Sequence, residues 1–587
     1  MSSNGPKENV QLKSGLSIRK ELYDKLYSYQ AVGIDWMYGL YMKNEGGILA
    51  DDMGLGKTLQ SVALISSLLE CNQIKSALIV APTTLLKHWK QEFVKWAPST
   101  VLATFDGAPA TRMKHLMKIQ SYGGVLLISE DLIFKFETEI TSFGNFIWDF
   151  LILDEVKNIK NATEETKTPE QNNLSEIWML FDFVMNGSLL GEYYFETPLL
   201  NGREENASDR ARLLSRRTAE RLWEIYQPYF LRRTKNEVLT DMQRLPRKYD
   251  WVVWIYLNQS QTETYKDFLN FNSIEKLTKE YSNAGFVHLL TLKNICDHMR
   301  LVSQDVVNEG AQHRNGNVSK NVLTGQDNFS IIGLTDEQLI GESAKLEFCL
   351  HLLETLRKEG HKTLLFSQST QMLDIIQQIL VHRNWKLSRL DREVVKMQRT
   401  DAIVHTFEND ADISVCLLSS QVAGVGLPLT SANRVIIYDP FWNSATDSQA
   451  IDRAYQIGQQ KEVIVYRLVT CGTVEEQIYR RQIFNDSITK HTVKENDSTR
   501  CFRREDLLQL LNFTDPTVSK TYQRITQIHG SDVNCTGLVA SHLQTLRGFD
   551  QVFNIHDHSK IFSAEKPQCL ESVLVINRLR MDEVQLD

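Results

Sequence analysis

A short glycine-rich segment, Gly54–Thr58 (GLGKT), has the residue types of a phosphate-binding loop and stands between an apolar stretch and a helical one. The backbone N–H groups of such a loop, with the N-terminus of the following helix, form a cradle for anions. The Lys57 ammonium would reach the β- and γ-phosphates of a nucleotide, and the Thr58 hydroxyl would bind Mg²⁺. Asp51 stands where the general pattern G-x-x-x-x-G-K-[ST] has its first glycine. The segment predicts a nucleotide site.

Two adjacent carboxylates follow an apolar stretch at 148–153 and could complete this site. Asp154 would hold Mg²⁺, and Glu155 would orient or deprotonate an attacking water. Without the upstream loop, the pair would equally well describe an acidic turn in solvent. Arg453, in the run QAIDRAYQIGQ, could neutralise charge on the γ-phosphate in the transition state, although taken alone it fits a surface helix charge better.

Short apolar stretches alternate with helical ones in two runs of the chain, which is typical of doubly wound parallel sheets. The first run predicts strands at 47–50, 77–81, 125–129 and 150–153, and the second at 363–366, 387–390, 415–418, 434–438 and 463–467. We therefore predict an α/β fold of two lobes. The predicted boundaries are a flexible tail at 1–20, a first lobe at 21–175, a mostly helical insertion at 176–340, a second lobe at 341–485 and a C-terminal extension at 486–587.

The composition is that of a globular protein. Of 587 residues, 42% are hydrophobic and 24% charged, which excludes a disordered or collagen-like chain. The net charge of −8 argues against a wholly basic nucleic-acid coat but allows a local basic groove. The eight cysteines form no CxxC pair, so neither a zinc knuckle nor a disulfide framework is favoured. With no signal peptide and no long apolar run, we expect neither secretion nor a membrane span.

Further motifs accompany the loop and the acidic pair between about Leu22 and Gln482. They are Tyr29-Gln30, Ala81-Pro82 with Trp89, 171–178, PYFLRRTKNEV at 228–238, 366–368, QVAGVGLPL at 421–429, 439–459 and 466–482. Together these motifs resemble those of the Swi/Snf-type ATPases, which are DNA translocases of helicase superfamily two. The resemblance implies two RecA-like lobes that use ATP and Mg²⁺ to move along double-stranded DNA.

The resemblance also implies roles for individual residues. Glu155 and Arg453 would be catalytic, Thr58 and Asp154 would hold the metal, and Asp154-Glu155-Val156-Lys157 would form the acid box. The nucleotide would be bound by Gln30, Asp51, Asp52, Met53, Gly54, Leu55, Gly56, Lys57 and Thr58.

Within the family, the stretch 468–492 is most similar to a chromosome-segregation member of the Cockayne-syndrome-B-like branch. This similarity implies chromatin as a partner, together with a mitotic kinase or other proteins, and no membrane. The expected location is the nucleus, on chromatin or mitotic chromosomes, or the cytoplasm in interphase.

The chain departs from the family pattern at four places. The acid box, usually DEAH or DEGH, ends in Val156-Lys157; Gln456 replaces a second arginine, and Arg392 replaces a glycine. The family also has a helix, a core strand and a Thr-rich motif where this chain has only VKNIKNATEETK before Thr168-Pro169. A parallel crossover needs a dozen or more residues. We therefore expect the first sheet to lack a central strand, its neighbours to lose backbone partners, and hydrolysis to be slow.

Three groups of basic residues could contact DNA phosphates without reading bases. They are Lys87, Lys90 and Lys95; Arg212, Arg216, Arg217 and Arg221; and Arg232, Arg233 and Lys235. A solvated helix face explains the second group equally well. Trp36, Trp89 and Trp178 fit a core better than a base-stacking platform.

Two alternative functions stay open. The first is a catalytically weak or inactive chromatin scaffold that binds ATP and DNA, which the departures at Lys157 and Gln456 support. The second is an RNA helicase, which PYFLRRTK and the helical insertion argue against.

Overall fold

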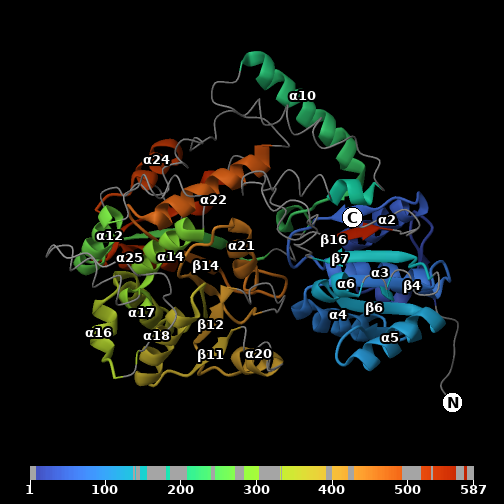
Figure 1. Cartoon of the computed structure of the whole chain (residues 1–587), viewed down its shortest axis with the longest axis horizontal. Coiled ribbons are helices and arrows are strands. Elements are labelled where there is room, and N and C mark those ends of the chain that lie inside the picture. The colour runs from blue at the N-terminus through green and yellow to red at the C-terminus, as the bar shows by residue number, and fades with distance from the viewer. Residues whose placement is uncertain are drawn as a thin grey trace. The chain divides into compact units, whose positions relative to one another are not determined.

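The computed structural model describes residues 8–136, 139–140, 146–154, 180–185, 208–238, 245–271, 283–302, 331, 333–391, 400–420, 429–491, 517–530, 533, 535–562 and 574–577. The chain forms two compact units (Figure 1), and each is described by itself. Unit 1 comprises Met1–Arg244 with Leu570–Asp587, and unit 2 comprises Leu245–Cys569. Among the described helices, none combines the length and the apolar character that crossing a bilayer requires.

Unit 1 is built on a seven-stranded sheet. Its strand order is β5 (Leu102–Thr104), β6 (Gly124–Ser129), β4 (Ser76–Ala81), β7 (Phe150–Asp154), β16 (Leu574–Asn577), β3 (Gly47–Leu49) and β8 (Phe230–Leu231). Neighbouring strands pair in parallel, except for the two pairs that β16 makes. A small antiparallel pair, β1 (Asn9–Gln11) with β2 (Ser17–Arg19), flanks the buried Leu16. The described part of 1–20 therefore packs on unit 1 rather than forming a flexible tail.

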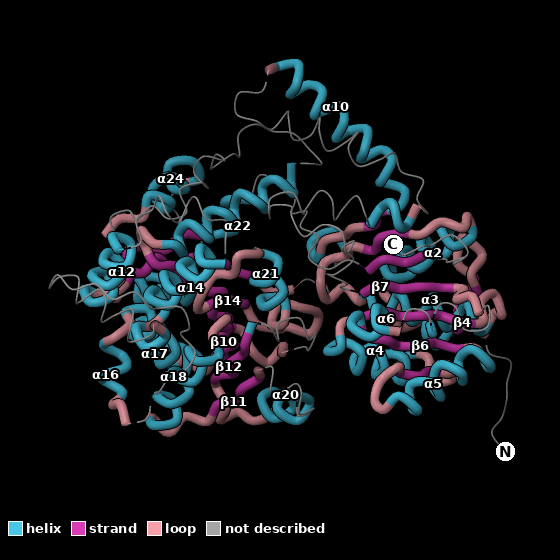
Figure 2. Tube along the Cα trace, viewed as in Figure 1, coloured by secondary structure: helices cyan, strands magenta, loops and turns pink. Residues whose placement is uncertain are grey.

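The helices of unit 1 mostly lie beside the strands of this sheet, whereas α10 (Asp209–Tyr226) extends away from it (Figure 2). They are α1 (Lys20–Tyr23), α2 (Ser28–Met42), α3 (Lys57–Glu70), α4 (Thr83–Trp96), α5 (Pro109–Tyr122), α6 (Glu130–Lys135), α10 and α11 (Lys235–Val238), with a 3₁₀ turn at Gln227–Tyr229. Successive residues of a strand point to opposite faces. In β4, Ala77 and Ile79 accordingly enter one apolar cluster, whereas Leu78 and Val80 enter another. Both faces of the sheet are thus buried, which explains why its strands are continuous apolar runs.

Unit 2 contains a second seven-stranded sheet. Its order is β11 (Leu387–Leu390), β12 (Val415–Ser419), β10 (Thr363–Ser367), β13 (Arg434–Ile437), β14 (Val463–Thr470), β9 (Lys248–Ile255) and β15 (Val552–Asp557). All neighbours pair in parallel except β15, which pairs antiparallel with β9 and forms one edge of the sheet. The prediction of an α/β fold with two doubly wound, mainly parallel sheets is confirmed.

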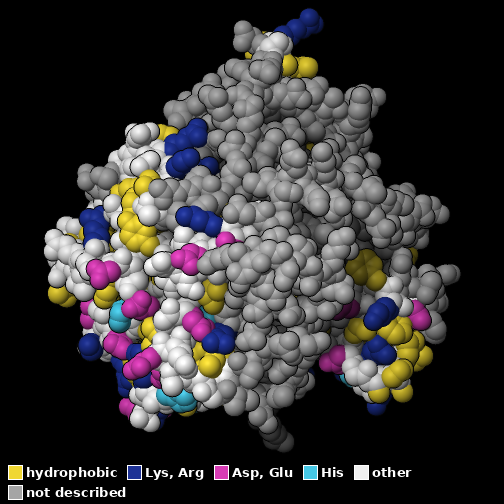
Figure 3. Space-filling view, turned by 60° about the vertical axis from the view of Figure 1, so that its left-hand side comes forward, with side chains coloured by type: hydrophobic (Ala, Val, Ile, Leu, Met, Phe, Trp, Pro, Cys, Tyr) yellow, Lys and Arg dark blue, Asp and Glu magenta, His cyan; other side chains and the backbone are white. Residues whose placement is uncertain are grey.

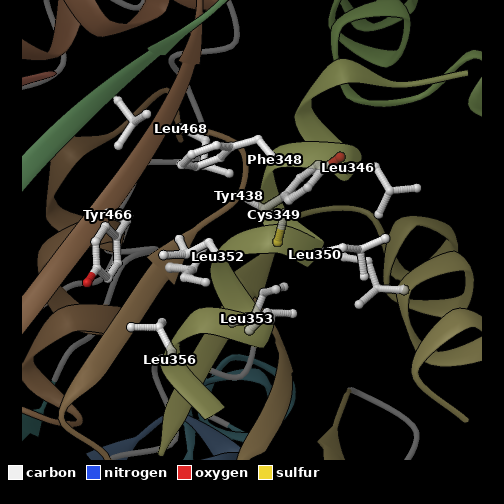
Figure 4. Close-up of a cluster of buried hydrophobic side chains, with 14 of the residues drawn as sticks. Leu346, Phe348, Cys349, Leu350, Leu352, Leu353, Leu356, Tyr438, Tyr466 and Leu468 are labelled. Atoms are coloured by element: carbon white, nitrogen blue, oxygen red, sulfur yellow. The ribbon is translucent and has the colours of Figure 1, made fainter. Parts of the chain in front are cut away.

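The helices of unit 2 are α12 (Gln259–Phe271), α14 (Asn283–Asp297), α16 (Asp336–Gly341), α17 (Ala344–Lys358), α18 (Thr370–His382), α20 (Thr400–Asn409), α21 (Ser444–Asp452), α22 (Val474–His491), α24 (Lys520–His529) and α25 (Leu538–Arg547), with 3₁₀ turns at Met299–Leu301 and His558–Phe562. The Ser343 hydroxyl caps α17 by accepting from the Leu346 N–H. The apolar face of α17 packs on Tyr466 and Leu468 of β14 and on Tyr438, which directly follows β13 (Figure 4).

Five buried charges form an ion network inside unit 2. The Lys345 ammonium donates to Asp297 at 2.8 Å and to Glu475 at 2.5 Å, and the Lys293 ammonium contacts Asp297 and Asp439. Burial raises the pKa of Glu475 to about 7. Burial alone would also raise the pKa of Asp297, but Lys293 and Lys345 lower it. The network joins α14 and α17 to α22, so its charges are satisfied within the fold.

The sheet of unit 1 corrects the expectation of unpartnered backbone at a missing strand. The place between β3 and β7 is filled by β16, a segment from near the chain's other end, and Figure 1 shows it beside β7. Leu574 pairs with Leu49 on one side and with Asp154 on the other. The strands β3 and β7 therefore have partners on both sides.

Candidate nucleotide site

The glycine-rich segment forms a loop between β3 and α3, as its sequence predicts. Gly54 has φ +84° and Gly56 has φ +78°, a left-handed conformation that favours glycine. A Cβ on Gly56 would also come within 2.5 Å of the Gln30 Nε2 atom. The loop therefore requires glycine at this position for two reasons, and it directs the N-terminus of α3 towards the carboxyl edge of the sheet.

Lys57, the first residue of α3, is half-buried, and its ammonium donates to the Asp51 carbonyl oxygen at 2.5 Å. Thr58 follows it and is also half-buried. A carbonyl oxygen is a weaker partner for an ammonium than a phosphate oxygen, because charge-assisted bonds between two ions are stronger. The loop thus holds Lys57 at the position where a phosphate could take over this contact.

The Asp51 side chain is buried and belongs to a clamp beneath the loop. Its Oδ1 accepts from the Arg233 Nε at 2.9 Å and from the Arg233 backbone N–H at 3.1 Å, and its Oδ2 pairs with the Arg233 guanidinium. Gln60 of α3 donates to Oδ2 at 3.2 Å. Asp51 therefore ties the segment after β8 to the phosphate loop, which gives a physical reason for an acid at the first glycine position.

A neighbouring pair of contacts extends the clamp. Asp52 accepts from the Lys235 backbone N–H at 2.9 Å and from Arg232 at 3.4 Å. Sequence reasoning assigned Arg232, Arg233 and Lys235 to DNA phosphates, but the structure places them against the loop. Arg233 as organiser of the loop was missed. The sequence signal for it was Asp51 at the first glycine position of the loop pattern, because a carboxylate buried at that place needs a cation as its partner.

Gln30 and Tyr29 of α2 support the loop from its other side. The Gln30 amide and the Tyr29 hydroxyl both donate to the Leu55 carbonyl at 3.1 Å. Burial, followed by the charge of Asp51, raises the pKa of Tyr29 above its usual range, so this hydroxyl keeps its proton. Leu55 and Met53 are buried, whereas Gly54 is exposed. The structure thus brings together the predicted nucleotide residues from Gln30 to Thr58.

Asp154 ends β7 at the same edge of the sheet. It is largely buried, and its Oδ2 accepts from the Trp89 indole N–H at 2.6 Å. Trp89 is completely buried, in agreement with its assignment to the core. A hydroxyl at Thr58 and a carboxylate at Asp154 are the oxygen ligands that Mg²⁺ prefers. Among the described residues, no three His, Cys, Asp or Glu side chains cluster in a way that could hold a metal ion.

In unit 2, Arg453 follows α21 and is 5% exposed. Its carbonyl accepts from the Leu429 N–H at 3.0 Å and from the Gln456 side-chain amide at 3.2 Å. Gln456, which replaces an arginine of the family pattern, therefore holds the backbone of Arg453. The predicted residues Glu155, Val156, Lys157, Thr168, Trp178, Arg392 and 421–428 lie outside the described residues.

The basic residues proposed for DNA fall into different settings. Lys87, Lys90 and Lys95 of α4 are exposed, and Lys95 lies 4.6 Å from the Trp96 ring centre. On α10, Arg217 and Arg221 are exposed, and Arg221 pairs with Glu224 at 2.7 Å; the side chains of Arg212 and Arg216 lie outside the description. On the left-hand part of the surface in Figure 3, Lys and Arg intermingle with Asp and Glu among the described residues. The half-buried Trp36 donates to the Pro228 carbonyl at 3.1 Å rather than offering a free ring edge.

Comparison with known proteins defines the class. Residues 29–301 match the SNF2-related domain, and residues 344–458 match the helicase conserved C-terminal domain. The chain thus joins an SNF2-related domain to a helicase conserved C-terminal domain, which confirms the family resemblance at this level.

Within this class, the chain is similar to proteins named DNA excision repair protein ERCC-6-like. The one from Danio rerio is 38% identical over 607 residues, covering 94% of this chain and 42% of the relative. The one from Homo sapiens is 37% identical over 603 residues, covering 94% and 48%. The chain spans less than half the length of these relatives. A solved structure, the Sulfolobus solfataricus SWI2/SNF2 ATPase core in complex with dsDNA, is 27% identical, with 84% of this chain and 98% of that chain covered and a TM-score of 0.34.

Proposed function

We propose that the chain is an ATPase that moves along double-stranded DNA without separating the strands, and that its hydrolysis is slow. The observation that carries the proposal is the loop 54–58. Its left-handed glycines direct the α3 N-terminus and Lys57 towards the edge of the sheet at which β7 ends with Asp154. This arrangement supports an anion site beside a carboxylate, in a chain with SNF2-related and helicase C-terminal domains.

In the proposed site, the phosphates of ATP replace the Asp51 carbonyl as the partner of Lys57. Thr58 and Asp154 would hold Mg²⁺, which neutralises phosphate charge when bound. The Arg233–Asp51 clamp keeps the loop in shape before ATP arrives, so little ordering is required on binding. Glu155 would orient water, and Arg453 would neutralise developing charge.

DNA as the track is supported by the names of the relatives and by the exposed lysines of α4. Lys87, Lys90 and Lys95 can contact phosphates of any sequence. Binding should therefore weaken steeply as salt rises and vary little with base sequence. A flat salt response in an equilibrium binding titration would argue against this track.

Slow hydrolysis is supported by Lys157, Thr168 and Gln456, which depart from the family pattern. An arginine finger contributes about 10³–10⁵ in rate where it acts. The Gln456 amide bonds the Arg453 carbonyl, so Gln456→Arg removes a backbone support while it adds a charge. We expect this variant to change turnover by less than about threefold, within the scatter of a small context effect. A large gain would show that position 456 alone limits the rate.

The deciding experiment measures ATP turnover with duplex DNA, with single-stranded RNA and with neither. Weak stimulation by duplex DNA and tight ATP binding support the proposal. Fast ATP turnover stimulated by duplex DNA would show a translocase with normal hydrolysis, whereas stimulation by RNA alone would support the RNA helicase. Binding of ATP and DNA without turnover supports the chromatin scaffold, which the departures at Lys157 and Gln456 favour as the second candidate.

The cellular setting belongs to the same proposal. The stretch 468–492 resembles the Polo-interacting checkpoint helicase, a protein of DNA threads in chromosome segregation. We therefore place the chain in the nucleus and on mitotic chromosomes, with a mitotic kinase among its partners. Imaging of the tagged chain through mitosis tests this location, and exclusion from chromosomes would contradict it.

A further inference from the structure

The strand β16 differs from every other member of its sheet. The pairs β5–β6, β6–β4, β4–β7 and β3–β8 are all parallel, whereas β16 is antiparallel to both of its neighbours. Three of its residues, 574–576, pair with Gly47–Leu49 on one side, and all four pair with 151–154 on the other. It therefore lies between the strand that precedes the phosphate loop and the strand that ends in Asp154.

The adjoining strands depend on this pairing to different extents. β3 has three residues, and only Ile48 and Leu49 pair with β8 on its far side. Without β16, one edge of β3 and one edge of β7 would be bare. A bare strand edge is a template for another strand, and buried unpaired N–H and C=O groups are costly. β7 would still be paired with β4, but β3 would keep only its two-residue ladder with β8.

We propose that Leu574–Asn577 is a complementing strand supplied within the same chain, and that the order of the nucleotide loop depends on it. The gap between β3 and β7 acts as a binding site for an extended, uncharged apolar peptide. The sequence LVIN fits this chemistry because Val and Ile favour strands and no charge would enter the sheet centre. Main-chain hydrogen bonds on two edges supply the recognition.

The strand β16 links residues 574–577 to the edge of the sheet that carries the glycine-rich loop and Asp154. Leu574 pairs with Leu49 and Asp154, the last residues of β3 and β7. The part of the proposal that concerns ATP affinity rests on the proposed function. The part that concerns the strand does not, so the two can fail separately.

Hydrogen exchange on the intact chain tests the strand without any variant. The amides of Leu574–Asn577 should be protected to the same degree as those of β3, because all of them lie inside one ladder. The amides of β6 provide the internal reference. Exchange of 574–577 at the rate of a free peptide would overturn the proposal whether or not the chain binds ATP.

A matched pair of variants tests the consequence. In a strand with partners on both sides, each N–H faces one neighbour or the other, so Val575→Pro must remove a ladder bond. We expect Val575→Pro to speed exchange in β3 and to weaken ATP binding about tenfold, whereas Val575→Ile changes both less than about twofold. Equal behaviour of the two variants would overturn the proposal.

Deletion of 570–587 removes the strand, and a synthetic peptide of sequence ESVLVINRLR (571–580) can then be added to the deleted chain to replace it. Rescue of β3 protection by the peptide, with no rescue by a scrambled peptide, supports a site for an extended strand. A light-scattering mass that shows a dimer of the intact chain, and a monomer after deletion, would overturn supply within one chain in favour of exchange between two copies. Full β3 protection in the deleted chain without peptide would overturn the proposal altogether.

Discussion

Lys57 in unit 1 and Lys345 in unit 2 show how differently the two units use a buried or half-buried cation. Lys57 is half-buried at the start of α3, and one of its contacts is the neutral carbonyl of Asp51. Lys345 is completely buried and forms ion pairs with the carboxylates of Asp297 and Glu475. The contact of Lys57 with a neutral carbonyl can be exchanged for a stronger one with an anion, whereas both of these contacts of Lys345 are already with carboxylates. The comparison separates a site that can bind a ligand from one that holds the fold together.

The two sheets differ in a similar way. Unit 2 adds its antiparallel strand β15 at the edge, next to β9, while unit 1 takes its antiparallel strand β16 into the interior. Detachment of an edge strand leaves the backbone groups of one neighbouring strand unpaired, whereas detachment of an interior strand leaves those of two strands unpaired. Unit 1 therefore carries both the exchangeable cation and the more vulnerable sheet.

The largest expected effect is on Lys57. Lys57→Ala should reduce ATP turnover by about 10²–10³-fold or abolish ATP binding, because the ammonium held for phosphate is lost. Lys75→Ala is the matched control, since Lys75 is exposed and precedes β4 at the amino end of the sheet. Isothermal titration with ATP and a turnover assay measure the two variants. An unchanged ATP affinity in Lys57→Ala would show that ATP does not bind at this loop of unit 1.

The second prediction concerns Lys345. Lys345→Met should destabilise unit 2 by about 3–5 kcal/mol, because Asp297 and Glu475 are left buried without this cation. Urea unfolding measures the loss, while ATP affinity measured in the native range should stay the same. If Lys345→Met lowered the ATP affinity without lowering the free energy of unfolding, the ion network would contribute to ATP binding.

The third prediction contrasts neighbouring arginines. Arg233→Ala should cost roughly 1.5–3 kcal/mol, the range for hydrogen bonds to a charged group, because the buried Asp51 carboxylate keeps only Gln60 and a backbone N–H among these partners. Arg232→Ala should cost less than about 1 kcal/mol, since its 3.4 Å contact with Asp52 is partly exposed. Both are measured by thermal unfolding and ATP affinity. Equal effects would mean that the clamp does not shape the loop.

The last prediction is a pH dependence in unit 2, which is gradual over several pH units. Burial raises the pKa of Asp447 to about 7, although Arg467 at 3.3 Å and Gln482 at 2.8 Å oppose the shift. The folded state therefore holds this proton between about pH 4 and 7, and stability falls as pH rises through that window. Asn cannot titrate, so the stability of Asp447→Asn relative to the original chain should rise by up to about 1.4 kcal/mol per pH unit and level off above pH 7.

Urea unfolding at four pH values measures this trend, with the exposed Asp550→Asn as control. A stability difference that stays constant with pH would show that Asp447 is charged in the folded protein throughout. That result would move it to the class of permanently paired carboxylates.

Much of the fold could be predicted because strands buried on both faces are continuous apolar runs. β4, β6, β7 and β10 were found within about one residue for this reason. β5 and β8 have three and two residues, too few for a pattern to be visible. β9 lies in a stretch that was expected to be mostly helical, although its WVVWI core was a usable strand signal.

The candidate site was predicted in its residues but only partly in its contacts. Gly54, Gly56 and Lys57 were found because a phosphate loop is contiguous in sequence. The Asp51–Arg233 pair was not, because the two residues are 182 positions apart and only the fold joins them. The same limit hid β16, since strand pairing between distant segments leaves no local periodicity in either one.

The place of β16 has a consequence for biosynthesis. A ribosome releases the chain from its N-terminus, so the residues of β3, the phosphate loop and β7 emerge long before Leu574–Asn577. The first unit to leave the ribosome is thus the last to close its sheet. Until Leu574–Asn577 has been translated, β3 and β7 each keep one open strand edge, which is prone to pairing with a strand of another chain.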